Sequence, residues 1–287
     1  MGLTVIRAKH YEPYTDDPLS INADLVADWL VRFLKDEVIR RRGISKAVLG
    51  LSGGVDSAVV AYLCARAFGP ENVHAFRMPY KISSKESVEH ADLVVKDLGI
   101  NARTVEITGM ADGYINAHEP EISPSRLGNV CARCRMIVLF DQSAQLNCLP
   151  VGTGNKSERL FGYYTWHADD SPPINPLGDL FKTQVWALAR ALGVPTEIVE
   201  KPASADLIQG QTDEKDFGIT YEAADKILHF MTQGYSKQKL LRMGFPAVDL
   251  DLVWKRVDGT HWKRRLPTVA MLSSTAIGEY YLRPVDF

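Results

Sequence analysis

The chain has 287 residues, of which 46% are hydrophobic and 24% charged, and its 33 basic and 35 acidic side chains give a net charge of −2. This composition excludes disordered, collagen-like and rod-like coiled-coil proteins, and the lack of a basic excess argues against a nucleic-acid partner. The sequence shows no apolar stretch long enough for a bilayer, no signal-peptide pattern and no cysteine framework, so we expect a cytoplasmic protein with reduced thiols and no membrane partner.

The apolar periodicity predicts alternating helices and strands in the first part of the chain. A first helix is expected over Ile21–Arg42. The strands expected after it are Lys46–Leu51, Val73–Met78, Arg103–Ile107 and Leu149–Gly152, and the helices between them are Asp56–Phe68, Ser84–Leu98 and Ser125–Asn147. Such alternation indicates an α/β protein with a doubly wound parallel sheet, in which ligands bind at the carboxyl ends of the strands.

Beyond Pro176 the pattern changes to helices and loops. A helix is expected over Phe181–Leu192, where Gly193 ends it. The polar, aperiodic stretch Lys201–Gly218 is interpreted as a mobile lid, and two further helices follow it. We therefore expect an N-terminal arm over residues 1–20, a single domain over residues 21–270 and a tail over residues 271–287.

A loop rich in glycine and serine joins the first strand to the next helix. Consecutive glycines permit positive φ angles and let backbone N–H groups face a ligand, while serine hydroxyls and the helix N-terminus add donors. These features predict a phosphate-binding loop made of Ser52, Gly53, Gly54, Val55, Asp56 and Ser57. Asp56 could hold Mg²⁺ against the phosphates. The loop lacks the lysine of a Walker A motif, and a tight strand-to-helix turn is the alternative interpretation.

Other polar residues follow the neighbouring strands. Arg77 and Met78, at the end of the second strand, are candidates for an adenine site, and Thr153 offers a hydroxyl to ATP. Glu158 lies beyond the fourth strand, where it could complete a Mg²⁺ site with the loop aspartate or be a solvated surface carboxylate. Lys182 stands at a helix start, where a cation is disfavoured unless an anion neutralises it, so we predict that it binds phosphate.

The sequence S-G-G-x-D-S resembles the pyrophosphate loop of the ATP pyrophosphatase superfamily, whose members cleave ATP between the α- and β-phosphates. Four later segments resemble the NAD synthetase family in particular: Gly128–Met136, Gly152–Glu158, Leu180–Val185, and Lys201–Leu207 with Asp213–Glu214. The resemblance runs from about residue 25 to residue 267. It implies a Rossmann-like fold of the adenine nucleotide alpha hydrolase type with a helical C-terminal part. It also implies a homodimeric ligase that amidates deamido-NAD with ammonia, consumes ATP with Mg²⁺, and releases AMP and pyrophosphate.

The same resemblance implies roles for individual residues. Lys182 and Ser204 match family positions that contact ATP, and Lys182 is the expected catalytic partner of the loop aspartate. Arg133 and Lys263 match positions that contact the pyridine-nucleotide substrate, and Asn129 lies in the same motif as Arg133. The segment before the nucleotide loop is too short for a glutaminase domain, so free ammonia is the expected nitrogen source, and the alternative is a separate subunit that delivers it.

The sequence departs from the family pattern at positions that the resemblance assigns to the second substrate. Trp166, Pro173 and Trp262 replace a lysine, an aspartate and a histidine of the shorter bacterial members. We expect both tryptophans to stack on rings of the substrate, and Asp169 or Asp170 to replace the missing carboxylate. The alternatives are a relative that amidates a different acid, a tRNA-modifying enzyme of the superfamily, or a silent nucleotide-binding protein. The pair Cys131-x-x-Cys134 is interpreted as apolar packing rather than as a zinc site, because no second pair accompanies it.

Overall fold

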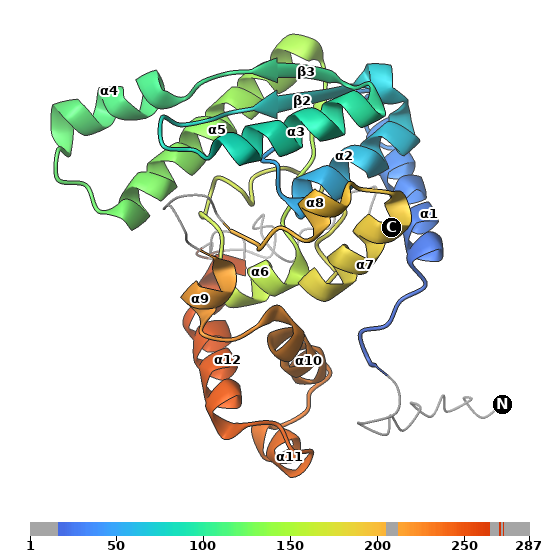
Figure 1. Cartoon of the computed structure of the whole chain (residues 1–287), viewed down its shortest axis with the longest axis vertical. Coiled ribbons are helices and arrows are strands. Elements are labelled where there is room, and N and C mark those ends of the chain that lie inside the picture. The colour runs from blue at the N-terminus through green and yellow to red at the C-terminus, as the bar shows by residue number, and fades with distance from the viewer. Residues whose placement is uncertain (1–16, 205–211, 265–269, 271, 273–287) are drawn as a thin grey trace.

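The computed structural model describes residues 17–204, 212–264, 270 and 272. Its sheet has four strands in the order β3-β2-β1-β4, and every neighbouring pair is parallel (Figure 1). The strands are β1 (Ala47–Gly50), β2 (Val73–Arg77), β3 (Asn101–Thr104) and β4 (Leu149–Pro150). The arm over residues 1–16, part of the expected lid and nearly all of the expected tail lie outside the described residues.

Helices account for most of the remaining chain. They are α1 (Ala23–Leu34), η1 (Lys35–Arg40), α2 (Val55–Phe68), η2 (Pro70–Asn72), α3 (Lys85–Leu98), α4 (Thr108–His118), α5 (Pro124–Leu146), α6 (Lys156–Phe161), α7 (Lys182–Leu192), α8 (Thr196–Val199), α9 (Asp213–Phe217), α10 (Tyr221–Thr232), α11 (Lys237–Arg242), α12 (Ala247–Gly259) and η3 (His261–Arg264). None of these helices has the length and apolar character that a membrane span requires within the described part of the chain.

The sheet is covered on both faces because its buried strands are apolar on both sides. In β1, Ala47 and Leu49 pack in a core with residues of α1, α2, α3 and α7, whereas Val48 packs in a second core with residues of α4 and α5. Cys131 and Cys134 are buried in this second core. The α/β prediction with a doubly wound parallel sheet is therefore confirmed.

The strand order places a topological switch point between β1 and β4. The chain builds β1, β2 and β3 outward in one direction and then returns to add β4 on the other side of β1. Crevices outside the carboxyl ends of strands at such a point are the usual ligand sites of open α/β sheets. The loops after Gly50 and Pro150 both open at this point.

Most predicted elements differ from the structure by one or two residues at an end, and two differ in kind or position. The helix expected over Ile21–Arg42 is α-helical only to Leu34 and continues as a π-helix, η1. The strand expected over Arg103–Ile107 is β3, which begins two residues earlier and ends three residues earlier. Gly99 ends α3 with a φ of +65°, so the chain turns early enough for Asn101 to pair with His74 of β2.

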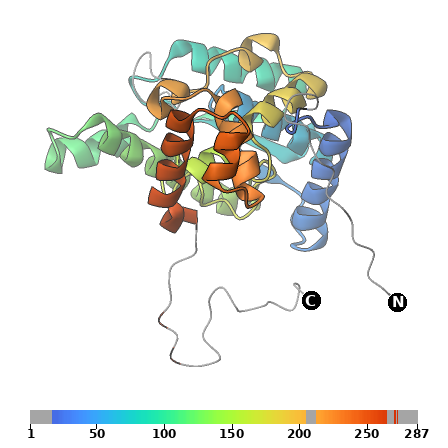
Figure 2. The same cartoon turned by 90° about the horizontal axis from the view of Figure 1, so that it is seen from below.

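Several helices had no counterpart in the prediction. α4 contains two glycines and buries only Ala111 and Ile115, so its apolar pattern is weak. Three helices, α10, α11 and α12, follow the expected lid instead of two. They pack around a third core, which lies below α6 and α7 in Figure 1 and toward the viewer in Figure 2. The helical C-terminal part that the resemblance implied is present.

Candidate active site

A cleft of about 1800 Å³ opens at the carboxyl ends of β1, β2 and β4. Its lining includes Gly50, Met78 and Val151, which end or follow these three strands. Typical small-molecule sites occupy roughly 300–1000 Å³. The cleft therefore has room for more than one nucleotide-sized ligand.

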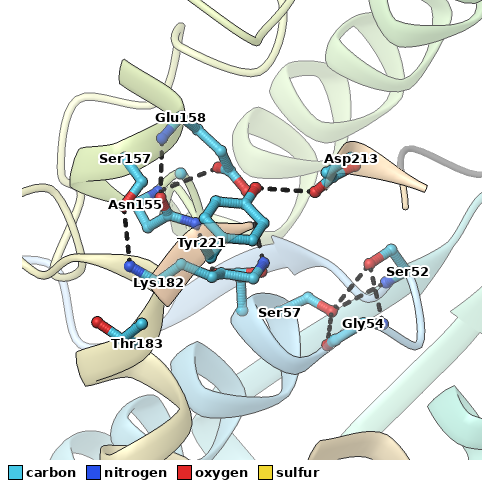
Figure 3. A network of polar contacts seen from close by, with 12 residues as sticks. Ser52, Gly54, Ser57, Asn155, Ser157, Glu158, Lys182, Thr183, Asp213 and Tyr221 are labelled. Carbon is cyan, nitrogen blue, oxygen red and sulfur yellow. Dashed lines mark hydrogen bonds and ion pairs between the residues drawn. The ribbon is translucent and has the colours of Figure 1, made fainter. Parts of the chain in front are cut away.

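The loop between β1 and α2 is a tight turn held by its own serines (Figure 3). Ser52 N–H donates to Ser57 Oγ at 3.2 Å, and Ser57 Oγ donates to the carbonyl oxygen of Gly54 at 3.0 Å. Gly54 N–H donates to Ser52 Oγ at 3.3 Å. Gly53 has a φ of +80°, in the left-handed region that glycine favours. The positive φ and the helix start, on which the phosphate-binding prediction depends, are both present.

Three charged side chains from three helices meet beside this loop. Asp56 belongs to the first turn of α2, Glu158 to α6, and Lys182 is the first residue of α7. Lys182 Nζ donates to Asp56 Oδ2 and lies 3.6 Å from Glu158 Oε1. Lys182 is only 2% exposed, whereas the side chains of Asp56 and Glu158 are 17% and 19% exposed. The Lys182 side chain is thus nearly enclosed, yet it lines the cleft together with the two carboxylates.

The cluster brings two carboxyl groups beside one ammonium group. Burial and then the Asp56 carboxylate raise the pKa of Glu158 above its ordinary value. Burial lowers the pKa of Lys182, but the carboxylates of Asp56 and Glu158 outweigh it, so the pKa ends above its ordinary value. Lys182 therefore stays cationic at neutral pH, and a further cation beside the two carboxyl groups would favour the ionised form of Glu158.

Asn155 is a fully buried residue of this cluster to which the sequence interpretation gave no role. Its Nδ2 donates to Asp56 Oδ1 at 3.0 Å. Its Oδ1 accepts the Glu158 N–H at 2.9 Å, and Glu158 Oε2 accepts the Asn155 N–H at 3.2 Å, which makes a capping box. The pattern Asn-x-x-Glu is a sequence signature of this box and could have revealed the start of α6. Asn155 thus orients both carboxylates.

Asp213 connects the expected lid to the cluster. It is the first residue of α9, is 4% exposed, and accepts the Tyr221 hydroxyl at 2.9 Å through Oδ2. Its Oδ1 is buried without a hydrogen-bond partner among the described residues. The Lys182 ammonium lies 5.5 Å from the centroid of the Tyr221 ring. The part of the expected lid over residues 205–211 lies outside the described residues.

All the predicted loop residues except Gly53 line the cleft. The remaining residues predicted to contact ATP line it as well: Arg77, Met78, Thr153 and Ser204. Arg77 is held by its neighbours, because its Nε donates to Thr104 Oγ1 at 3.0 Å and its guanidinium pairs with Asp92. Ser204 is the last described residue before the gap. Their contacts with ATP stay a prediction.

The residues predicted to bind the second substrate divide into two groups. Asn129, Asp170 and Lys263 line the cleft, whereas Arg133, Trp166 and Trp262 do not belong to its lining. The residues of the second group contact one another. Arg133 Nη2 donates to the Trp166 carbonyl oxygen at 3.1 Å. The rings of Trp166 and Trp262 pack edge to face with their centroids 5.2 Å apart. The tryptophans therefore contact each other, and their stacking on a substrate stays a prediction.

Comparison with known proteins finds a matching family model, curated relatives and similar solved structures. The family model "NAD synthase" matches residues 26–267. An NH(3)-dependent NAD(+) synthetase of Fusobacterium nucleatum is 46% identical over 88% of this chain and 98% of its own length, and one of Trichlorobacter lovleyi is 47% identical over 90% and 94%. Among solved structures, an NMN synthetase of Francisella tularensis matches with a TM-score of 0.78 and 29% identity over 88% of this chain and 99% of its own. An NH3-dependent NAD synthetase of Campylobacter jejuni matches with a TM-score of 0.76 and 32% identity over 88% and 100%.

Proposed function

The chain belongs to the NAD synthase family, and from this membership we propose that it converts deamido-NAD to NAD with ATP and free ammonia. The observation that carries the proposal is the cluster of Asp56, Glu158 and Lys182 beside the Ser52–Ser57 loop, at the switch point of the sheet. These residues are the ones a reaction on the phosphates of ATP would need, and the relatives named above match nearly the whole chain.

The chemistry must turn a carboxylate into an electrophile. A carboxylate oxygen of the substrate attacks the α-phosphorus of ATP, and the bond to the bridging oxygen of the β-phosphate breaks, which releases pyrophosphate. Ammonia then attacks the carbonyl carbon of the acyl-adenylate, loses a proton to solvent and expels AMP. Lys182 neutralises charge that develops on the departing pyrophosphate, and the N–H groups of the Ser52–Ser57 loop hold it. Exclusion of water from the cleft protects the adenylate from hydrolysis.

The carboxylates fit a magnesium ion. Among the described residues, no three His, Cys, Asp or Glu side chains lie close enough to hold a metal by themselves. Magnesium, however, is usually bound through one or two carboxylates together with substrate phosphates. Asp56 and Glu158 supply two carboxyl groups. Burial and then the Asp56 carboxylate raise the pKa of Glu158, and a bound cation would lower it. When bound, Mg²⁺ would neutralise charge on the phosphates.

We expect Glu158→Gln to raise the half-saturating concentration of Mg²⁺ by about tenfold or more, because one charged ligand is lost. The matched control is Glu197→Gln, which removes an exposed carboxylate from the lining of the same cleft without touching the cluster. The measurement is pyrophosphate release against Mg²⁺ concentration at fixed ATP. Equal shifts in the two variants would rule Glu158 out as a ligand.

One observation supports a second candidate for the carboxylic acid that is amidated. Trp166, Pro173 and Trp262 replace the family's lysine, aspartate and histidine, and a solved structure that resembles this chain is named an NMN synthetase. The competing substrate is therefore nicotinate mononucleotide. The higher identity to the NH(3)-dependent NAD(+) synthetases supports deamido-NAD.

The test supplies purified protein with ATP, Mg²⁺ and ammonia, and compares deamido-NAD, nicotinate mononucleotide and a panel of other carboxylic acids. We expect pyrophosphate and amide product in equal amounts, with the highest kcat/KM for deamido-NAD. A preference for nicotinate mononucleotide would establish the second candidate, and release of neither product would support a silent nucleotide-binding protein. Glutamine in place of ammonia tests the nitrogen source.

A homodimer forms part of the proposal. The first helix, α1, carries Leu25 and Trp29 with 67% and 70% exposure, and α5 carries Ile137 and Phe140 with 52% and 38%. Exposed apolar side chains of this size favour a protein contact. The four cysteines bear on the location of the protein. All four are buried and free, which is how a reducing compartment would keep them. The cytoplasmic location stays a prediction.

We expect Trp29→Glu to convert the dimer to a monomer, because a carboxylate would be buried in the contact. Val248→Glu is the control, since Val248 is 71% exposed on α12, away from both helices. Light scattering after size-exclusion chromatography measures the mass. A parent protein that is monomeric at all concentrations would contradict the proposed dimer.

A further inference from the structure

Asp225 of α10 is a buried carboxylate that the proposed chemistry leaves without a role. It is 0% exposed and does not belong to the lining of the cleft, so it cannot touch a ligand there. It accepts hydrogen bonds from the Ser157 hydroxyl, from Thr183 N–H at 3.0 Å and from Thr183 Oγ1 at 2.9 Å. Ser157 Oγ in turn accepts the Lys182 N–H at 3.0 Å (Figure 3).

These contacts join the first turns of two helices. Ser157 is the second residue of α6 and is followed by Glu158, whereas Thr183 is the second residue of α7 and is preceded by Lys182. Asp225 therefore fastens the backbone immediately beside the second carboxylate and immediately beside the lysine. A negative charge is also favourable at this end of a helix, where backbone N–H groups lack intrahelical partners.

Packing alone would not require a carboxylate at this position. The neighbouring residues Ile227 and Leu228 of α10 already bury apolar side chains in the core below α6 and α7. Burial is the main cause that raises the pKa of Asp225 to about 6. Holding an ionised carboxylate at this buried position therefore costs free energy. Buried polar networks that are fully satisfied hold side chains in one arrangement, which apolar contacts do less strictly.

We propose that Asp225 is a positioning residue, which fixes the distance between Lys182 and Glu158 by binding the starts of α6 and α7. The effect on turnover rests on the function proposed above. Because the groups that bind ATP through the Ser52–Ser57 loop are separate from these contacts, loss of Asp225 should change kcat more than the KM for ATP.

The test compares Asp225→Asn with Leu228→Ala. The amide of asparagine keeps the shape of the side chain but places an N–H₂ group against one of the present donors. The Leu228→Ala control leaves a cavity one turn away on the same helix, so it lowers stability without touching the network. We expect kcat of Asp225→Asn to fall by about 10- to 100-fold, as misplaced catalytic groups do, with a KM for ATP within about threefold of the parent. Leu228→Ala should keep kcat within about twofold at a temperature where it is folded.

A second variant covers the case in which Asp225→Asn does not fold. Ser157→Ala removes the hydroxyl between Asp225 and the Lys182 backbone, and it should also lower kcat without raising the KM for ATP. Its combination with Asp225→Asn should lose no more than the worse single variant, because both act through one network. Additive losses, an unchanged kcat in a folded variant, or an equal loss in Leu228→Ala would overturn the inference.

The parent assay separates this inference from the proposed function. If the parent releases no pyrophosphate with any acid, the proposed function fails. In that case, crystal structures of the parent and of Asp225→Asn are compared for the position of the Lys182 ammonium. A Lys182 ammonium that contacts Asp56 and Glu158 equally in both would overturn the inference, and one that moves away from them in the variant would support it.

Discussion

Replacing Lys182 with methionine is expected to lower kcat for pyrophosphate release by about 100- to 1000-fold, which is the usual loss when one preorganised charge donor is removed. Methionine keeps most of the buried aliphatic stem but not the ammonium group, which contacts Asp56 and lies 3.6 Å from Glu158. Negative charge develops on the pyrophosphate as it leaves. Without Lys182, that charge would lose the ammonium group that the two carboxyl groups hold in place.

Lys156→Met is the matched control for this substitution. Lys156 also stands at the first position of a helix, but its ammonium pairs at 2.8 Å with Asp179, whose side chain is 95% exposed. An exposed pair of this kind contributes roughly 0–1 kcal/mol. We expect kcat of Lys156→Met to stay within about twofold of the parent and both variants to remain folded by thermal unfolding. A folded Lys182→Met enzyme with more than a tenth of the parental kcat would remove Lys182 from the proposed chemistry.

The parts of the fold that the sequence predicted are those with strong local signals. The strands β1 and β2 are short apolar runs, and Gly69 and Gly99 end the helices beside them. The helix α4 was missed because its side chains are mostly exposed, so no apolar face marks it. The start of β3 depends on pairing with β2, which is a tertiary contact that no local pattern encodes.

The residues of the candidate site also divide into those with a local sequence signal and those that depend on tertiary contacts. Asp56, Glu158 and Lys182 lie in motifs with distinctive residue types, and the structure brings them together. Asn155 contacts Asp56 across 99 positions in sequence, and Asp225 contacts Ser157 across 68. A single polar residue in an amphipathic helix such as α10 carries no sign of such a partner. These supporting residues therefore emerge only from the folded chain.

Substituting alanine for Gly53 is expected to lower kcat/KM for ATP by about 100-fold, as a misplacement of about 1 Å at a reacting site can do. The Cβ atom of an alanine at this position would lie 2.0 Å from the backbone carbonyl oxygen of Ser87. That oxygen belongs to the first turn of α3, so a flexible side chain cannot relieve the clash. Either the phosphate-binding loop or α3 must move, and both line the cleft.

Gly99→Ala separates this clash from the cost of the backbone conformation. Gly53 and Gly99 have φ angles of +80° and +65°, but a Cβ at Gly99 would meet no atom within 4 Å. Both variants should lose about 1–2 kcal/mol of stability from the left-handed conformation. For a chain of this size that corresponds to a fall in Tm of roughly 2–8 °C. Only Gly53→Ala should also lose ATP binding, which equilibrium titration with ATP measures directly. If the two variants bound ATP equally well, the close approach of Ser87 would have no part in shaping the loop, and the phosphates would have to lie elsewhere in the cleft.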